Sequence, residues 1–215
     1  MNQLPLPRPS ALDLALAALR DDICRPEGPQ ISTMRSYRFA IVPYHPRQEF
    51  QLRRGSQRLV SELAAHGWTV LPISLQALLI KRLRALGEDV LERMAEREQD
   101  AAEISTARAL GYLAEKLAPH IDGADGIAAD VCREIADFVT HNPDKAERTI
   151  VLVGRAGALY PFFRTSALLR YIDGRTGGIP VILFYPGCRE GDNGLSFMCR
   201  LKPDRDYRPR IYSAS

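Results

Sequence analysis

The sequence lacks long apolar runs, clustered cysteines and any sign of a leader segment. None of its apolar runs approaches the roughly 20 residues that a membrane-spanning helix requires, although the chain has 215 residues. The first residues contain no basic stretch followed by a continuous apolar one, so no secretory leader is expected. Together these absences favour a soluble cytoplasmic protein with no membrane contact.

Cysteine is scarce, and its spacing fits no metal-binding motif. None of the cysteines belongs to a CxxC pair, and no group of cysteines and histidines has the spacing of a zinc site. In a cytoplasmic chain such residues are expected to stay free thiols, so neither a metal nor another cofactor is predicted. The cysteines are Cys24, Cys132, Cys188 and Cys199.

The patterns of the common catalytic sites are also missing. The sequence contains no G-x-S-x-G elbow that would expose Ser166 or Ser196 as a nucleophile. His66 and His141 fall at the ends of predicted helices, where a positive charge is favourable. His45 lies in a loop after a predicted strand and is the histidine best placed for chemistry. No catalytic residue is assigned.

Lysine is rare, and the basic side chains are nearly all arginines in a chain whose net charge is only +3. Arginine suits phosphate and carboxylate partners, although biased codon usage explains the same excess. A C-terminal strip of basic residues could contact a nucleic-acid backbone, while its interleaved aspartates favour a solvated edge. DNA contact through this strip is therefore kept as an alternative function. The strip contains Arg200, Lys202, Arg205, Arg208 and Arg210, with Asp204, Asp206 and Tyr207 between them.

Apolar runs rich in β-branched and aromatic residues predict the strands of a central sheet. The run at 149–154 is the clearest, because its continuous apolar character is typical of a strand buried on both faces. Strands that alternate with helices form a mostly parallel sheet, here of about five strands with helices on both faces. The sequence therefore predicts one α/β domain over residues 1–215. Strands are expected at 37–43, 68–73, 149–154 and 179–185, with a last edge strand at 208–213.

Helices are predicted from the spacing of their apolar residues. Segments 10–23, 46–66 and 159–172 each place apolar side chains on one face, and Ser10 is the expected N-cap of the first. Residues 1–9 are punctuated by proline and are expected to form a loose arm.

A polar, charge-rich stretch separates the second and third predicted strands. It is predicted to be a helical insertion over 74–148, with a break at Gly87. Ile127, Val131, Ile135 and Val139 form a regular stripe with a spacing of four residues, which indicates a helix with one buried face. The rest of the insertion suits either a partner surface or a solvated helix pair.

The loop after the third predicted strand combines Gly154, Arg155 and Gly157 just before a predicted helix. Exposed backbone N–H groups and a guanidinium could hold an anion together, which makes a phosphate- or nucleotide-binding module an alternative function. The spacing matches neither the Walker A loop nor the G-x-G-x-x-G fingerprint. A tight turn that needs small residues, with Arg155 paired to a carboxylate, explains the pattern without any ligand and is the favoured interpretation.

Two further loops follow predicted strands, where ligands gather in open α/β sheets. One is Pro43–Pro46 after the first strand. The other follows the fourth strand and contains three glycines together with Arg189, Glu190 and Asp192. Glycines permit close approach of the backbone, which suits a ligand loop, a protein-contact loop or an ordinary surface excursion.

Several of these segments resemble the BrxB family of the bacterial BREX phage-exclusion systems. The turn at Arg155–Pro161 and the segment Phe184–Gly187, followed by Gly194–Met198, are similar to the family's core. The junction at Pro43–Pro46 is similar to its first strand–helix junction. The order of elements agrees over nearly the whole chain, while the middle helices carry no matching motif.

The resemblance implies a small cytoplasmic BREX component that works beside the phosphatase-like protein PglZ, a large ATPase and a DNA methyltransferase. It implies physical association with PglZ and supplies no catalytic residue. We therefore expect a non-catalytic adaptor or scaffold, with DNA contacted only weakly or through partners. The candidate contact residues are Arg155, Tyr160, Arg164, Arg189 and Glu190.

Overall fold

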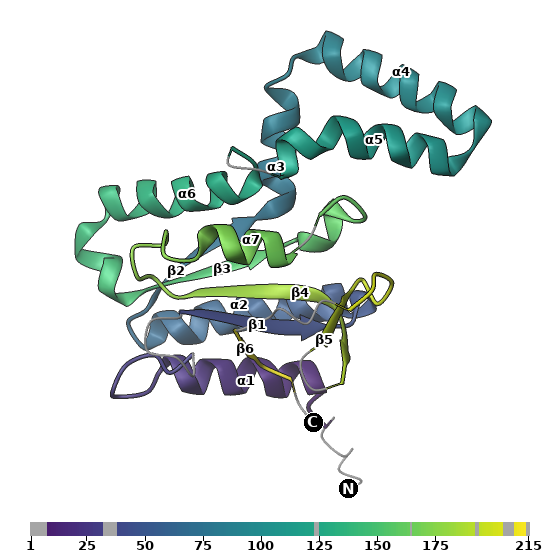
Figure 1. Cartoon of the computed structure of the whole chain (residues 1–215). Coiled ribbons are helices and arrows are strands. Elements are labelled where there is room, and N and C mark those ends of the chain that lie inside the picture. Colours follow the sequence, from purple (N-terminus) through teal and green to yellow (C-terminus); the bar gives the residue numbers. More distant parts are fainter. Residues whose placement is uncertain are drawn as a thin grey trace, which may run out of the picture. The chain divides into compact units, whose positions relative to one another are not determined.

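The computed structural model describes residues 8–31, 38–122, 125–163, 165–191, 194–203 and 209–213 (Figure 1). Its backbone packing divides the chain into two compact units. Unit 1 comprises Met1–Leu71, Glu147–Leu152 and Ile179–Ser215, and unit 2 comprises Pro72–Ala146 and Val153–Gly178. Unit 2 thus holds most of the predicted insertion and a second segment that begins in the last residues of the third strand.

The described residues form α-helices, short 3-10 helices and strands in an alternating order. The strands are β1 (Phe39–Tyr44), β2 (Thr69–Ser74), β3 (Thr149–Gly154), β4 (Val181–Glu190), β5 (Gly194–Phe197) and β6 (Arg210–Ile211). The α-helices are α1 (Ala11–Ile23), α2 (Glu49–Ala65), α3 (Leu75–Arg84), α4 (Glu88–Ile104), α5 (Thr106–Ile121), α6 (Ile127–His141) and α7 (Thr165–Ile172). The 3-10 helices are η1 (Pro46–Gln48), η2 (Pro143–Arg148) and η3 (Ala156–Leu159).

The strands form one mostly parallel sheet, as predicted. Its order is β2-β3-β4-β1-β6, and β5 pairs with β4 off this path. β1 runs parallel to β4, with Phe39 opposite Val181 and Tyr44 opposite Pro186. The two-residue strand β6 lies parallel to β1 at the edge, which agrees with the edge position expected from Pro209.

The fourth strand is longer than predicted. The sequence predicted a strand over 179–185 that ends before Pro186–Gly187, but β4 continues to Glu190 and pairs antiparallel with β5. Pro186 lies opposite Tyr44, the last residue of β1, so the strand changes partner where its neighbour ends. A Cβ atom at Gly187 would overlap the Ser196 carbonyl oxygen and the Tyr185 ring. The glycine that suggested a stop therefore permits a close hairpin.

The helix predicted at 159–172 begins later than expected. The segment after β3 first forms η3, and α7 begins only at Thr165. Tyr160 is extended, with φ −67° and ψ 139°, because the proline that follows it disfavours helical backbone at the preceding residue.

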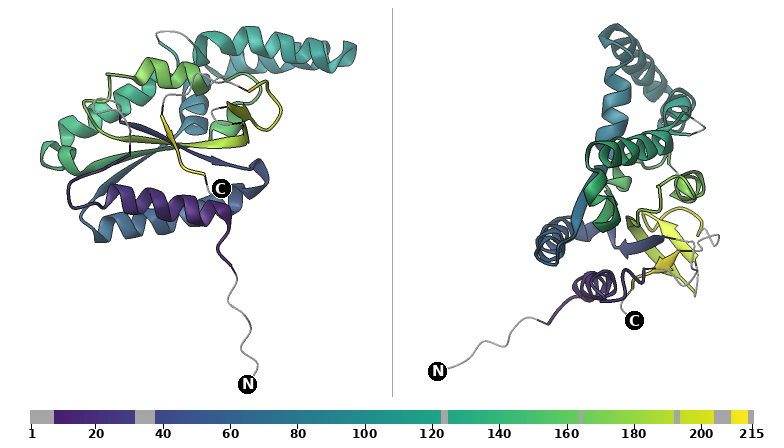
Figure 2. Two further views of the ribbon diagram at one scale, coloured as in Figure 1. Left: turned by 60° about the horizontal axis from the view of Figure 1, so that its bottom comes forward. Right: turned by 90° about the vertical axis from the view of Figure 1, so that its left-hand side faces the viewer.

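In unit 1, α1 and α2 pack together against the strands and form its core (Figure 2). Ser10 caps α1 by accepting a hydrogen bond from the Asp13 N–H at 3.1 Å, which confirms the predicted N-cap. A Cβ atom at Gly55 of α2 would lie 2.5 Å from Leu16 Cδ1, so the glycine brings the two helices close. Each fully buried leucine of this kind stabilises the fold by about 1.5–3 kcal/mol. The core includes Leu16, Leu19, Ile23, Leu59, Leu63, Trp68, Ile150, Leu152, Ile182 and Phe184.

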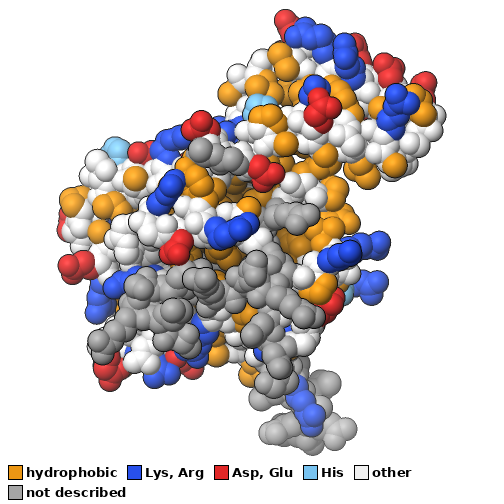
Figure 3. Space-filling model, in the orientation of Figure 1, with side chains coloured by type: hydrophobic (Ala, Val, Ile, Leu, Met, Phe, Trp, Pro, Cys, Tyr) orange, Lys and Arg blue, Asp and Glu red, His pale blue; other side chains and the backbone are white. Residues whose placement is uncertain are grey.

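Unit 2 contains α3 to α7, and no helix among the described residues is long and apolar enough to cross a membrane. The predicted stripe on α6 is confirmed at Ile127, Val131 and Ile135, which are all buried, whereas Val139 near the end of the helix is only partly buried. Arg82 of α3 donates to Asp130 of α6 at 3.0 Å and to the Gly126 carbonyl oxygen at 2.9 Å. By contrast, α4 has no buried residue, and Figure 3 shows charged side chains scattered over the α4–α5 hairpin.

Candidate functional site

Arg155 follows β3 in unit 2 with a left-handed backbone, at φ 63° and ψ 25°. Its guanidinium donates twice to the side-chain oxygen of Gln76, at 2.7 and 3.1 Å, and is partly buried. The side chain is therefore tied to the first turn of α3. Tyr160, further along the same segment, is half-buried, and Arg164 lies outside the described residues.

The anion site suggested for Gly154, Arg155 and Gly157 receives little help from a helix dipole. The loop enters η3, which has only four residues, rather than the long helix that the sequence predicted. Phosphate binding here stays a prediction.

Arg189 and Glu190 lie in unit 1 and are both exposed on the β4–β5 hairpin. The Arg189 guanidinium donates to the Ser213 hydroxyl at 2.7 Å and to the Gly191 carbonyl oxygen at 3.3 Å. The hairpin base is well packed: the rings of Tyr185 and Phe197 meet edge to face with centroids 5.5 Å apart. The two charges are thus presented on a firmly held strand pair rather than on a loose loop.

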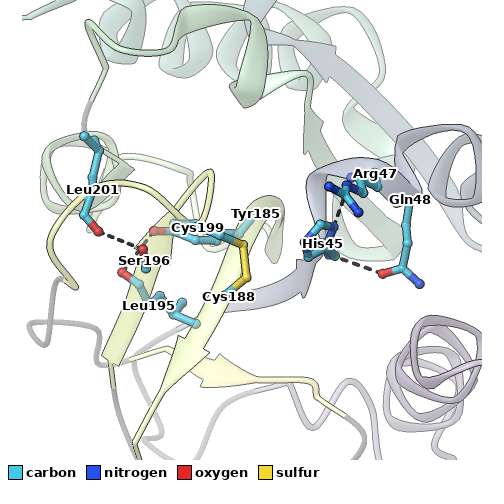
Figure 4. The surroundings of a disulfide bond; sticks show 9 residues. All are labelled: His45, Arg47, Gln48, Tyr185, Cys188, Leu195, Ser196, Cys199 and Leu201. Carbon is cyan, nitrogen blue, oxygen red and sulfur yellow. Dashed lines mark hydrogen bonds between the residues drawn. A yellow bond between two sulfur atoms is a disulfide. The ribbon is translucent and has the colours of Figure 1, made fainter.

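Cys188 and Cys199 are joined by a disulfide, with their Cα atoms 5.0 Å apart (Figure 4). The expectation of free thiols was wrong for this pair. The two cysteines are separated by 11 positions, and the hairpin, which the sequence did not predict, brings them together. Cys24 and Cys132 are free, and burial raises the pKa of both thiols, which makes them less reactive.

His45 lies beside the cysteine pair. It begins η1, where its Nδ1 accepts a hydrogen bond from the Arg47 N–H at 3.2 Å and its own N–H donates to the Gln48 side chain at 3.2 Å. The ring and the two sulfur atoms offer ligand atoms that all lie within 4.8 Å of one another. Sequence spacing could not reveal this cluster, because its members come from the ends of two neighbouring parallel strands and from a turn after a third.

The C-terminal basic strip is only partly described. Arg210 forms an ion pair with the buried Asp22 at 2.6 Å and donates to the Gln30 carbonyl oxygen at 2.9 Å. Its guanidinium also lies over the Tyr212 ring, 4.8 Å from the centroid. Arg210 therefore has a structural role, Arg200 and Lys202 are exposed, and the segment 204–208 lies outside the described residues. DNA contact stays a prediction.

A comparison with protein-family models matches residues 71–211 to the family described as BREX protein BrxB. The match spans more than half of the 215-residue chain. The chain belongs to the BrxB family. The resemblance read from the sequence is thereby confirmed, and it makes the chain a component of a BREX phage-defence system.

The matched range leaves out part of unit 1. It begins in β2, so the Pro43–Pro46 junction that resembled BrxB lies before it, whereas the η3 segment and the β4–β5 hairpin lie within it. The comparison with curated proteins found no match, and the comparison with solved structures found none either.

Proposed function

We propose that this BrxB-family chain is a non-catalytic adaptor that binds the phosphatase-like protein PglZ in a BREX assembly for DNA modification and phage exclusion. Membership of the family supports the BREX setting. The observation that carries the adaptor role is the β4–β5 hairpin, which exposes Arg189 and Glu190 within the segment that matches the family.

The hairpin suits protein recognition because its shape is fixed before a partner arrives. Tyr185 is buried at its base, and its hydroxyl donates to the Leu195 carbonyl oxygen at 3.1 Å. Consecutive residues of a strand point to opposite faces, so Arg189 and Glu190 offer a cation on one face and an anion on the other. Charges held in this way favour the right partner and the right orientation over others.

The test measures how much of the chain binds to immobilised PglZ when the charges of Arg189 and Glu190 are exchanged. The double variant Arg189→Glu, Glu190→Arg keeps the net charge and is expected to weaken binding about tenfold, or about 1.4 kcal/mol. The matched control is Glu96→Arg, Arg97→Glu, which swaps two adjacent exposed charges on α4. Undiminished binding of the first variant, or loss in the control alone, would place the interface elsewhere.

The second set of candidate residues is tested in the same assay. Arg155→Glu is combined with Arg189→Glu, and the double variant is expected to bind PglZ less well than either single variant. Full retention of binding would remove both segments from the interface. Saturable binding of ATP, GTP or a cyclic nucleotide by the purified chain would instead favour the phosphate-binding module.

A further inference from the structure

We propose that Cys188, Cys199 and His45 bind a zinc ion when the two cysteines are reduced. The proposal rests on the cluster in unit 1 whose three ligand atoms lie within 4.8 Å of one another. It does not depend on the adaptor role, and it is tested without any partner. Figure 4 shows Cys188 on β4, Cys199 in the turn after β5, and His45 near them at the start of η1.

The spacing of the cluster is close to that of a zinc site. Zinc lies about 2.3 Å from a thiolate sulfur and about 2.0–2.1 Å from an imidazole nitrogen, so tetrahedral donors are roughly 3.3–3.8 Å apart. Once the disulfide is opened, small side-chain rotations bring the three donors to these distances. Two thiolates and one imidazole form a soft ligand set that favours zinc over magnesium or calcium.

The backbone holds both sulfur-bearing residues in place. Cys188 belongs to β4 and lies opposite Ser196 of β5. Cys199 follows β5 in a turn where Met198 and Cys199 have φ values of 56° and 54°, a conformation that residues with a Cβ rarely adopt. The turn is secured by the Cys199 N–H, which donates to the Ser196 carbonyl oxygen at 3.1 Å, and by the Met198 N–H, which donates to that of Pro186 at 2.8 Å.

That turn directs the Cys199 side chain back toward β4. Non-glycine residues with positive φ persist where the surrounding structure holds them, and they concentrate at functional sites. Without the positive φ values of Met198 and Cys199, the chain after β5 would not place the Cys199 side chain next to Cys188.

His45 is the most easily exchanged of the three ligands. Its Nδ1 accepts the Arg47 N–H, so the proton of the neutral ring is on Nε2. Ligation through Nε2 moves that proton to Nδ1, and ligation through Nδ1 replaces the Arg47 bond directly. Either way the metal bond is gained at the expense of one hydrogen bond, so the thiolates hold the ion more strongly than His45 does. The fourth position is left for water or for a side chain of a partner.

The disulfide and the zinc complex are alternative states of the same residues. A dithiol reductant opens the disulfide by transferring two electrons and two protons, which yields two thiols and the oxidised dithiol. Zinc then displaces both thiol protons and binds the thiolates. Bound zinc would in turn protect the cysteines from reoxidation.

The experiment uses the full chain, reduced with excess dithiol and desalted without oxygen. Elemental analysis after equilibration with zinc chloride is expected to give one zinc per chain, and cobalt in its place is expected to show sulfur-to-metal charge-transfer absorption. Alkylation followed by mass spectrometry is expected to find Cys188 and Cys199 protected by zinc. Absence of stoichiometric zinc in the reduced chain, or a disulfide that resists the dithiol, would overturn the proposal.

Variants assign the ligands one by one. Cys188→Ser and Cys199→Ser should each abolish the charge-transfer band, and His45→Ala should weaken zinc binding about tenfold. The matched control is Cys24→Ser, Cys132→Ser, which removes the chain's other two cysteines and should leave binding unchanged. If either serine variant fails to fold, the protection pattern of the unmodified chain decides. Zinc affinity unchanged by His45→Ala would exclude the three-ligand site.

Discussion

Asp22 joins the first helix of unit 1 to its last strand. The carboxylate is only 3% exposed. One of its oxygens accepts from Arg25 at 2.7 Å, and the other accepts from the Tyr212 hydroxyl at 3.0 Å and pairs with Arg210 at 2.6 Å. A buried carboxylate is tolerated because each oxygen has a charged or hydroxyl donor. The contact of Asp22 with Arg210 and Tyr212 could not be predicted from the sequence, because nearly the whole chain separates these residues.

Replacing Asp22 with alanine is expected to lower the free energy of unfolding by about 2–3 kcal/mol, because it leaves the buried Tyr212 hydroxyl without its acceptor. The loss is limited because Arg25 and Arg210 stay partly exposed. Urea unfolding measures the change. The control is Asp21→Ala, whose side chain is 67% exposed and whose loss should cost less than about 1 kcal/mol. Equal effects of the two substitutions would show that burial of Asp22 contributes little.

The Tyr212 hydroxyl makes the stability of the folded chain depend on pH in the alkaline range. Burial raises the pKa of the phenol well above its usual range, and the hydrogen bond to the Asp22 carboxylate acts in the same direction. The folded state therefore holds the proton more tightly than the unfolded state, whose tyrosines titrate near a pKa of about 10. The contribution of the Tyr212 hydroxyl to the free energy of unfolding is therefore at its full value below about pH 10, and it decreases as the pH rises further.

Tyr212→Phe is expected to remove this pH dependence. The unfolding free energy of the unchanged chain should fall toward that of the variant between about pH 10 and 11. The difference between the two, measured by urea unfolding at each pH, should be constant below about pH 9. A difference that widens with rising pH would contradict the assigned direction of the pKa shift.

At the scale of elements, the sequence predicted the runs that become β1 to β4 because continuous β-branched residues have few alternatives to a buried strand. The prediction of strand ends failed at a glycine, because glycine is common both where a strand ends and where two backbones approach closely. Gly187 after Pro186 is typical of a strand end, yet it also permits the close antiparallel pair with β5. Because that pair was not predicted, the Cys188–Cys199 bridge was not predicted either. Arg189 and Glu190 were expected in a loop after the fourth strand, but they are the last two residues of β4.

The same substitution at two glycines should have opposite effects. Gly187→Ala is expected to destabilise unit 1 by about 1–3 kcal/mol, because the new methyl group meets the backbone of Ser196, which cannot move aside easily. Gly111→Ala in α5 meets open space and should stabilise its helix by up to about 1 kcal/mol. Thermal unfolding of both variants measures the difference. A stabilised Gly187→Ala variant would mean that the hairpin is more loosely packed.

At the scale of the whole chain, the α/β class and the mostly parallel sheet followed from the alternation of strand and helix patterns. The division into two compact units did not, because it cuts the chain within β2 and β3, where the apolar pattern is continuous. Membership of the BrxB family was visible in short motifs, while the long insertion carries none that could indicate its role.

The low net charge of the chain predicts weak binding to nucleic acid. A chain of net charge +3 whose Arg210 is engaged by Asp22 is expected to give no gel shift with duplex DNA at about 150 mM salt. The exposed pair Arg200 and Lys202 can be changed together to glutamate without touching the Asp22 cluster. A shift that weakens with salt and disappears in this variant would favour the DNA-contact alternative.

The bridge between Cys188 and Cys199 also provides a way to follow the oxidation state of the purified chain. Arg189 is exposed and lies between the two cysteines, so trypsin that cuts after it opens the peptide backbone inside a closed ring. The flanking peptides would then migrate as one species on electrophoresis until a reductant separates them. Mobility of the digest compared with and without reductant would report the oxidation state of the pair.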